Sequence, residues 1–249
     1  MNKIDMYREK LATLQHWDEF LLRESGLPGP RGNIELGQAV ADLGDEALFL
    51  RYLTYTVDKA PINSPEEFLA FCGVLGLGKL LANGRLDVLP RLRLAASDPR
   101  WRTREGVAMA LQRFGDVHLS DLIDEMERWC AGNLLEQRAA AAAVCEPRFL
   151  KDASSTVRVL DILDRITESF LHSNADRKSP EFQALRKGMG YCWSVAVAAL
   201  PSEGKKRMER WFRSDNPDIL RVMRENLKKN RLERADAEWV KFWQEKLAK

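Results

Sequence analysis

The residues with the clearest chemical potential are Trp101 and Glu105, which stand four positions apart in the segment Asp98–Leu111. Side chains at this spacing lie on the same face of an α-helix. The apolar stripe of this helix is expected at other positions, namely Val107, Ala110, Leu111 and Phe114. An indole and a carboxylate away from that stripe can point into the groove where helical-repeat proteins bind partners. The alternative is a tryptophan that packs at the helix start beside a solvated glutamate.

A second pattern consists of arginines that occupy one shared position when the helical segments are aligned. These residues are Arg104, Arg138, Arg186 and Arg224. A ladder of arginines suits the phosphates of a nucleic-acid backbone, so we predict that they bind DNA together with Arg102. The alternative role is structural, because a guanidinium also binds helix C-terminal carbonyls or a carboxylate of the neighbouring repeat.

Two further aromatic residues, Tyr191 and Trp193, lie close together in one of these segments. Trp193 continues the apolar pattern of Ala196 and Val197, so we predict that it is buried in the core. Tyr191 falls outside this pattern. With Trp101 it could line an aromatic pocket.

The elements that position these residues are predicted to be helices, because apolar residues recur at three- and four-residue steps and alternating β-branched runs are absent. One N-terminal helix is expected from Ile4 to Glu24, ended by Gly26–Gly32. A capping residue before proline predicts four later helix starts, at Ser64-Pro65, Asp98-Pro99, Ser179-Pro180 and Asn216-Pro217. Further helices are predicted at Ile34–Leu43, Glu46–Tyr55, Leu86–Ala96, Leu119–Cys130, Thr156–His172, Gly204–Arg213 and Ala235–Lys249.

The aligned helices follow one another at intervals of 33, 34, 48 and 38 residues between Phe71 and Arg224. Such periods are typical of two-helix repeats of the HEAT class. We therefore predict an all-α fold, a HEAT-like helical-repeat solenoid built as a curved array of antiparallel helix pairs. A single domain would span residues 1–249, with N-terminal capping helices at 1–44, repeats at 45–230 and a C-terminal capping helix at 231–249.

The amino-acid composition limits the classes of protein to which this chain can belong. Hydrophobic residues make up 45% and charged residues 31% of the 249 residues, which is typical of a globular chain. The N-terminus lacks the pattern of a signal peptide, and no apolar run is long enough to cross a membrane. The four cysteines form no metal-binding spacing with the three histidines. We expect buried reduced thiols, a cytoplasmic location, a monomer, and no metal, cofactor or membrane partner.

Charge is distributed unevenly along a chain whose net charge is only +2. The segment Lys205–Arg234 contains eleven Lys or Arg residues and five acidic residues, and Arg85–Arg113 contains seven arginines and three acidic residues. Clusters of positive charge in a near-neutral chain indicate an anionic partner. The alternative is that long helices simply carry solvated basic faces.

Taken together, these motifs resemble the DNA alkylation repair glycosylases built from HEAT-like repeats, the AlkD-type enzymes. That family has a Trp followed four residues later by a catalytic Asp, which corresponds to Trp101 and Glu105 here. Its Gln-Arg-Ala-Ala motif corresponds to Gln137–Ala140, and its second aromatic residue corresponds to Tyr191. Glu105 thus replaces Asp, with a side chain one methylene longer, and Tyr191 replaces Trp.

The resemblance implies a protein that binds alkylated duplex DNA and hydrolyses the N-glycosidic bond of cationic N-alkylpurines. It assigns catalysis to Glu105, Trp101 and Tyr191, with Glu105 stabilising the sugar cation and positioning a water. It also implies that Arg138 holds a phosphate and that the base stays out of a deep pocket. Two alternatives remain at this level, a non-catalytic module that binds nucleic acid and a scaffold that binds other proteins.

Overall fold

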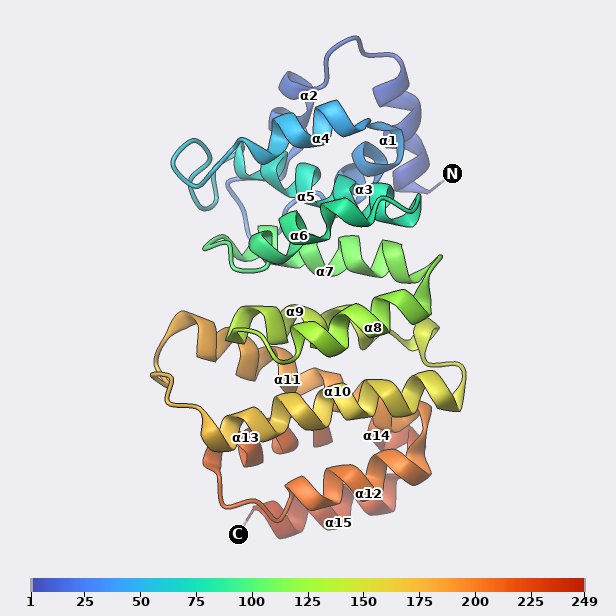
Figure 1. The fold of residues 1–249 in the computed structure, drawn as a ribbon, viewed down its shortest axis with the longest axis vertical. Helices are drawn as coiled ribbons and strands as arrows, with labels where there is room; N and C mark the ends of the chain where they lie inside the picture. Colours follow the sequence, from blue (N-terminus) through green and yellow to red (C-terminus); the bar gives the residue numbers. More distant parts are fainter. Residues whose placement is uncertain (1, 249) are drawn as a thin grey trace. The chain divides into compact units, whose positions relative to one another are not determined.

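The computed structural model describes residues 2–248 and is helical throughout, with fifteen α-helices and two short 3-10 turns in this range (Figure 1). No strand occurs among these residues, so the predicted all-α class is confirmed. The helices fall into two compact units, one ending at His118 and the other beginning at Leu119.

The first unit places the long buried helix α5 between three neighbours. Its contacts are most extensive with α7, α4 and α3, and α1 packs on α3. Nearly every residue of α5 is buried, as expected for a helix covered on all sides. The helices of this unit are α1 (Lys3–Ala12), α2 (Asp18–Glu24), α3 (Ile34–Leu43), α4 (Glu46–Leu53), α5 (Glu67–Ala82), α6 (Leu89–Ala95) and α7 (Trp101–Gly115).

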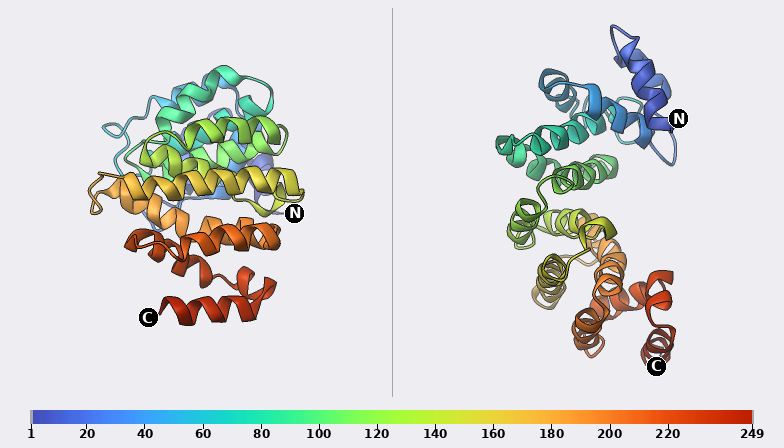
Figure 2. Two further views of the ribbon diagram at one scale, coloured as in Figure 1. Left: turned by 60° about the horizontal axis from the view of Figure 1, so that its bottom comes forward. Right: turned by 90° about the vertical axis from the view of Figure 1, so that its right-hand side faces the viewer.

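The second unit arranges its helices in two layers (Figure 2). In one layer α10 contacts both α8 and α12, and in the other α11 contacts α9, α13 and α14. The helices of this unit are α8 (Leu119–Trp129), α9 (Leu134–Val144), α10 (Ala153–His172), α11 (Pro180–Ala199), α12 (Pro201–Trp211), α13 (Pro217–Leu227), α14 (Asn230–Ala235) and α15 (Ala237–Leu247).

The predicted N-terminal helix is wrong in one respect, because the chain forms two helices there instead of one. Helix α1 ends at Ala12, and the Thr13 hydroxyl donates to the Lys10 carbonyl. The chain then turns through Trp17, whose indole N–H donates to the Leu11 carbonyl at 3.0 Å. Helix α2 begins only at Asp18.

Two of the four predicted capping residues act as caps. The Ser179 hydroxyl accepts from the Phe182 N–H, and the Asn216 side chain accepts from the N–H groups of Asp218 and Ile219. Each satisfies N–H groups that the first turn of a helix leaves without an intrahelical partner. At the other two sites the helix starts two residues after the proline, at Glu67 and Trp101.

Aromatic residues close the end of the second unit. Trp243 of α15 is buried against Phe212, with ring centroids 4.5 Å apart, and Trp239 donates to Glu209 of α12. A C-terminal helix was predicted at Ala235–Lys249, and the structure forms α15 there from Ala237 to Leu247, with α14 as a separate short helix before it; Lys249 lies outside the described residues. The predicted burial of Trp193 is also confirmed, since its ring is fully buried and its indole N–H donates to Thr167.

The four cysteines are buried and form no disulfide within the described residues, as predicted. Burial raises the pKa of the Cys72 and Cys145 thiols well above their usual range. These sulfurs therefore stay protonated and act as small apolar groups in the core.

Candidate functional site

The start of α7 is fixed by Arg100, and this sets the position of the Trp101 side chain. Asp98 accepts from the backbone N–H of Arg100 at 2.8 Å and from its guanidinium. The same buried guanidinium donates to the carbonyls of Tyr55 and Ala60. The predicted start at Asp98-Pro99 is therefore corrected, because Asp98 fixes the turn before the helix and α7 begins at Trp101.

Trp101 and Glu105 share one face of α7, as their spacing predicted. Trp101 is 43% exposed, and Glu105 is partly exposed. The next residue along the same line, Ala108, is buried. Trp101 and Glu105 are therefore the accessible residues at the start of this line, and Ala108 separates them from the partly exposed Gln112.

A small pocket of about 110 Å³ lies beside this pair, entirely within the first unit. Apolar side chains of α3, α5 and α7 form most of its wall, and the loop before α3 closes one side. The lining residues are Arg31, Gly32, Ile34, Phe68, Phe71, Trp101, Arg102, Glu105 and Met109. Sequence analysis did not place the Gly26–Gly32 loop or Phe68 and Phe71 at the site, because they come from distant segments whose approach depends on tertiary packing.

Arg102 lies in the pocket wall and is only 6% exposed. Its guanidinium carbon is 4.6 Å from the centroid of the Trp101 ring, a cation–π distance. The guanidinium donates to Glu67 Oε2 at 3.1 Å, to the Gly29 carbonyl at 2.5 Å and to Asn63 Oδ1 at 3.1 Å. The hydrogen bonds that Arg102 makes are therefore directed into the protein.

Asn63 makes further hydrogen bonds, which join its own loop to the loop around Gly29. Asn63 adopts a left-handed backbone conformation, with φ of 67°, and its N–H donates to Glu67 Oε2 at 2.6 Å. Its side-chain oxygen also accepts from the Gly29 N–H at 3.1 Å. The loop that walls the pocket is thus tied to the start of α5 through Glu67, which is completely buried.

The arginines predicted to form a ladder make several contacts with protein atoms. Arg104 donates to the carbonyls of Asp98 and Pro99, and Arg224 donates to the Leu247 carbonyl. Arg186 forms an ion pair with the buried carboxylate of Asp218, at 2.5 Å. Arg138 lies beside Gly188 of α11, since a Cβ added at Gly188 would stand 3.3 Å from its Cγ. The contacts of Arg104, Arg186 and Arg224 with carbonyls and a carboxylate are those expected of arginines with a structural role.

Tyr191 occupies a half-buried position on α11 in the second unit. Its hydroxyl donates to the Cys145 carbonyl at 2.9 Å, which joins α11 to the end of α9. Burial raises its pKa, and the nearby Arg231 opposes that shift from a position 5.3 Å from the ring centroid. The phenol is therefore neutral at physiological pH, and the Arg231–Tyr191 stack is a feature that sequence analysis did not find.

The two layers of the second unit differ in net charge. Helices α8, α10 and α12 carry nine acidic and seven basic residues. Helices α9, α11, α13 and α14, with Lys228 and Lys229, carry nine basic and five acidic residues. The layer that contains α11 is therefore the more positive of the two.

Two features of the described residues, 2–248, bear on other classes of site. They contain no group of three or more His, Cys, Asp or Glu side chains that could hold a metal ion. No helix among them is both long enough and apolar enough to span a membrane. Comparisons of the chain with models of protein families, with curated proteins and with solved structures find no match.

Proposed function

We propose that this protein binds duplex DNA and hydrolyses the N-glycosidic bond of positively charged N-alkylpurines. The observation that carries the proposal is the placement of Trp101 and Glu105 on one accessible face of α7, where both line the same pocket. The motifs that resemble the AlkD-type glycosylases support it. The positive layer of the second unit supplies cations for phosphates.

The chemistry requires a negative charge close to the sugar. An alkylated purine carries positive charge and leaves with the electron pair of the glycosidic bond, which neutralises the base. The sugar carbon becomes cationic, and a water oxygen then bonds to it. In the proposed mechanism the Glu105 carboxylate stabilises this cation and accepts the proton of the water, and the Trp101 ring packs against the sugar.

A base-release assay tests this proposal. The protein is incubated with duplex DNA that contains 7-methylguanine, and the free base is measured by chromatography. We expect release by the wild type and a loss of at least a hundredfold with Glu105→Gln, on the order of the effect of one removed electrostatic group. Glu168→Gln, at an exposed position of α10, serves as the control and should retain release.

The second candidate is a module that binds nucleic acid without catalysis. Glu105 and Tyr191 favour it, because they replace the Asp and the Trp to which the resemblance assigns catalysis. A protein that binds the duplex in a strongly salt-dependent manner but releases no base fits this candidate. Absence of salt-dependent binding to DNA would contradict both the glycosylase and the non-catalytic binding module.

A further inference from the structure

The pocket beside Trp101 is too small for a nucleobase but large enough for a small alkyl group. Its volume is about 110 Å³, and apolar atoms form most of its surface. An engineered apolar cavity of about 150 Å³ binds benzene. A group of only a few heavy atoms therefore fits between Phe68, Ile34 and Met109.

The wall also suits a group that carries positive charge. Aromatic rings attract cations through their faces, and Glu105 contributes a carboxylate. The two arginines of the wall are each paired with a carboxylate, Arg102 with Glu67 at 3.1 Å and Arg31 with Glu35 at 3.3 Å. Their charges therefore oppose a cationic group less strongly than two unpaired guanidinium groups would.

We infer that this pocket receives the N-alkyl group of the cationic base and that Gly32 sets the largest alkyl group that fits. The inference rests on the proposed function, since it assigns a substrate class to the same site. An alkyl carbon bonded to a charged ring nitrogen carries part of the positive charge, as the methyl groups of a quaternary ammonium ion do. Aromatic pockets recognise such groups.

Gly32 leaves open space that a side chain would fill. A Cβ added there would stand 3.7 Å from Arg102 Cδ and 3.9 Å from Phe68 Cδ2, which is ordinary van der Waals contact. Gly32→Ala therefore places a methyl group against the pocket wall without a clash. The variant reduces the space for an alkyl group and leaves Trp101 and Glu105 in place.

The first experiment measures base release from duplexes that carry N-methyl, N-ethyl or N-propyl purines. In the wild type we expect release of all three. In Gly32→Ala, the propyl-to-methyl ratio of kcat/KM should fall by about fourfold for each methylene that no longer fits. The change should appear in KM, because the alkyl group is bound in both the ground state and the transition state. Ala153→Val, at an exposed position of α10, is the control for added methyl groups and should keep the wild-type ratio.

The second experiment does not depend on catalysis. Tetramethylammonium is titrated into the protein, and the indole N–H signal of Trp101 is followed by NMR after assignment with Trp101→Phe. We expect a saturable shift of this signal that is weaker in Gly32→Ala. The neutral tert-butanol, of similar size, should cause a smaller shift than the cation.

The two experiments separate the inference from the function on which it rests. Binding of the cation without release of any base would contradict the proposed glycosylase and retain the pocket as a site for N-methyl cations. Base release with an unchanged propyl-to-methyl ratio in Gly32→Ala would overturn the inference and retain the glycosylase. If the protein neither binds the cation nor releases any base, both the inference and the proposed glycosylase function are overturned.

Discussion

Arg102 shows how the role of one residue depends on contacts that sequence does not reveal. Arg102 was predicted to bind DNA together with the aligned arginines. In the structure its guanidinium is buried and binds Glu67, Asn63 and Gly29, residues that lie 35, 39 and 73 positions away. Hydrogen bonds over such separations depend on the fold, so periodicity alone could not find them. The neighbouring pair, Trp101 and Glu105, could be predicted because it depends only on helix geometry.

Arg102→Met tests the energetic role of this buried ion pair. Removing the guanidinium leaves the Glu67 carboxylate, which is completely buried, without its cation. We expect the free energy of unfolding to fall by about 3–5 kcal/mol, measured by urea denaturation. The double variant with Glu67→Met should recover much of this loss, because it removes the buried charge. A loss below about 1 kcal/mol in the single variant would contradict the assignment.

At the scale of the helix, the helix starts that contain proline show what local sequence can predict. Ser179 and Asn216 cap their helices as expected, since a cap needs only a side chain and the next two or three N–H groups. Asp98 instead binds Arg100, whose guanidinium also reaches the loop carbonyls of Tyr55 and Ala60. This long-range contact moves the helix start, and local propensity contains no information about it.

The contact between α5 and α7 gives a prediction at the same scale. A Cβ added at Gly78 would stand 2.6 Å from the Ala110 Cα and carbonyl oxygen, so the two helix backbones would have to separate. We expect Gly78→Ala to lower the free energy of unfolding by about 1–3 kcal/mol, although alanine favours helix formation.

Gly188→Ala is the matched control for Gly78→Ala. Its added Cβ meets only the flexible Arg138 side chain, at 3.3 Å. Thermal and urea unfolding of the two variants should therefore differ, with the control close to the wild type or more stable. Equal stability of both variants would show that α5 and α7 do not require glycine at their contact.

At the scale of the whole molecule, the sequence predicted the helical class, most helix positions and the burial of Trp193. These features depend on apolar periodicity, which local sequence contains. The pocket beside Trp101 could not be predicted, because it combines a loop near Gly32 with α5 residues such as Phe68. The HEAT-like solenoid remains a prediction, although the layers of the second unit are compatible with paired helices.

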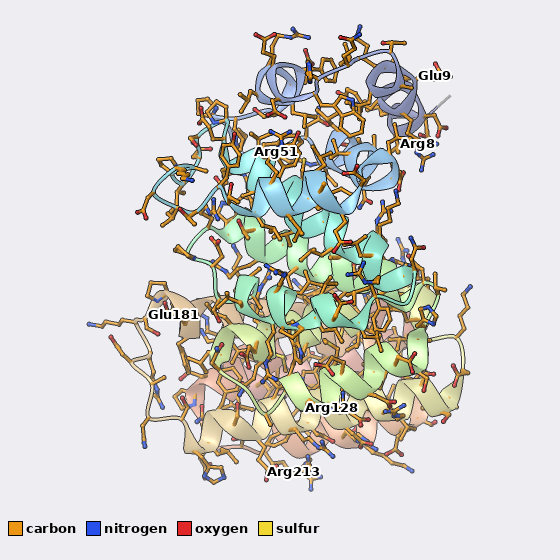
Figure 3. The ribbon with its side chains drawn as sticks, turned by 45° about the horizontal axis from the view of Figure 1, so that its top comes forward. Arg8, Glu9, Arg51, Arg128, Glu181 and Arg213 are labelled. Atoms are coloured by element: carbon orange, nitrogen blue, oxygen red, sulfur yellow. The ribbon has the colours of Figure 1, made fainter. Side chains whose placement is uncertain are left out.

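The pH dependence of folding gives a further prediction for the molecule. Arg51 on α4 (Figure 3) donates to Asp18 at 2.5 Å, and the Tyr52 hydroxyl donates at 2.6 Å. The Arg51 hydrogen bond is the main cause that lowers the pKa of Asp18 below its usual 3.8. This stabilisation is complete above pH 3.8 and is lost as pH falls through the lower pKa of the folded protein.

Asp18→Asn should therefore be less stable than the wild type at pH 7, and the difference should shrink below pH 3.8. Urea denaturation at pH 7 and at low pH measures both quantities. Asp58→Asn, in an exposed loop, serves as the control. A difference that stays constant with pH would exclude Asp18 as the titrating group.

The difference in net charge between the two layers of the second unit affects how this unit is oriented as it approaches a charged polymer. Helices α8, α10 and α12 together carry two more acidic than basic residues, and the helices of the opposite layer, with Lys228 and Lys229, carry four more basic than acidic residues, so these helices contribute an electric dipole through the thickness of the unit. Near any polyanion this dipole produces a torque that turns α11 and its neighbours toward the polymer before contact. Orientation of this kind raises the rate of productive encounters at low ionic strength and fades as the Debye length shortens.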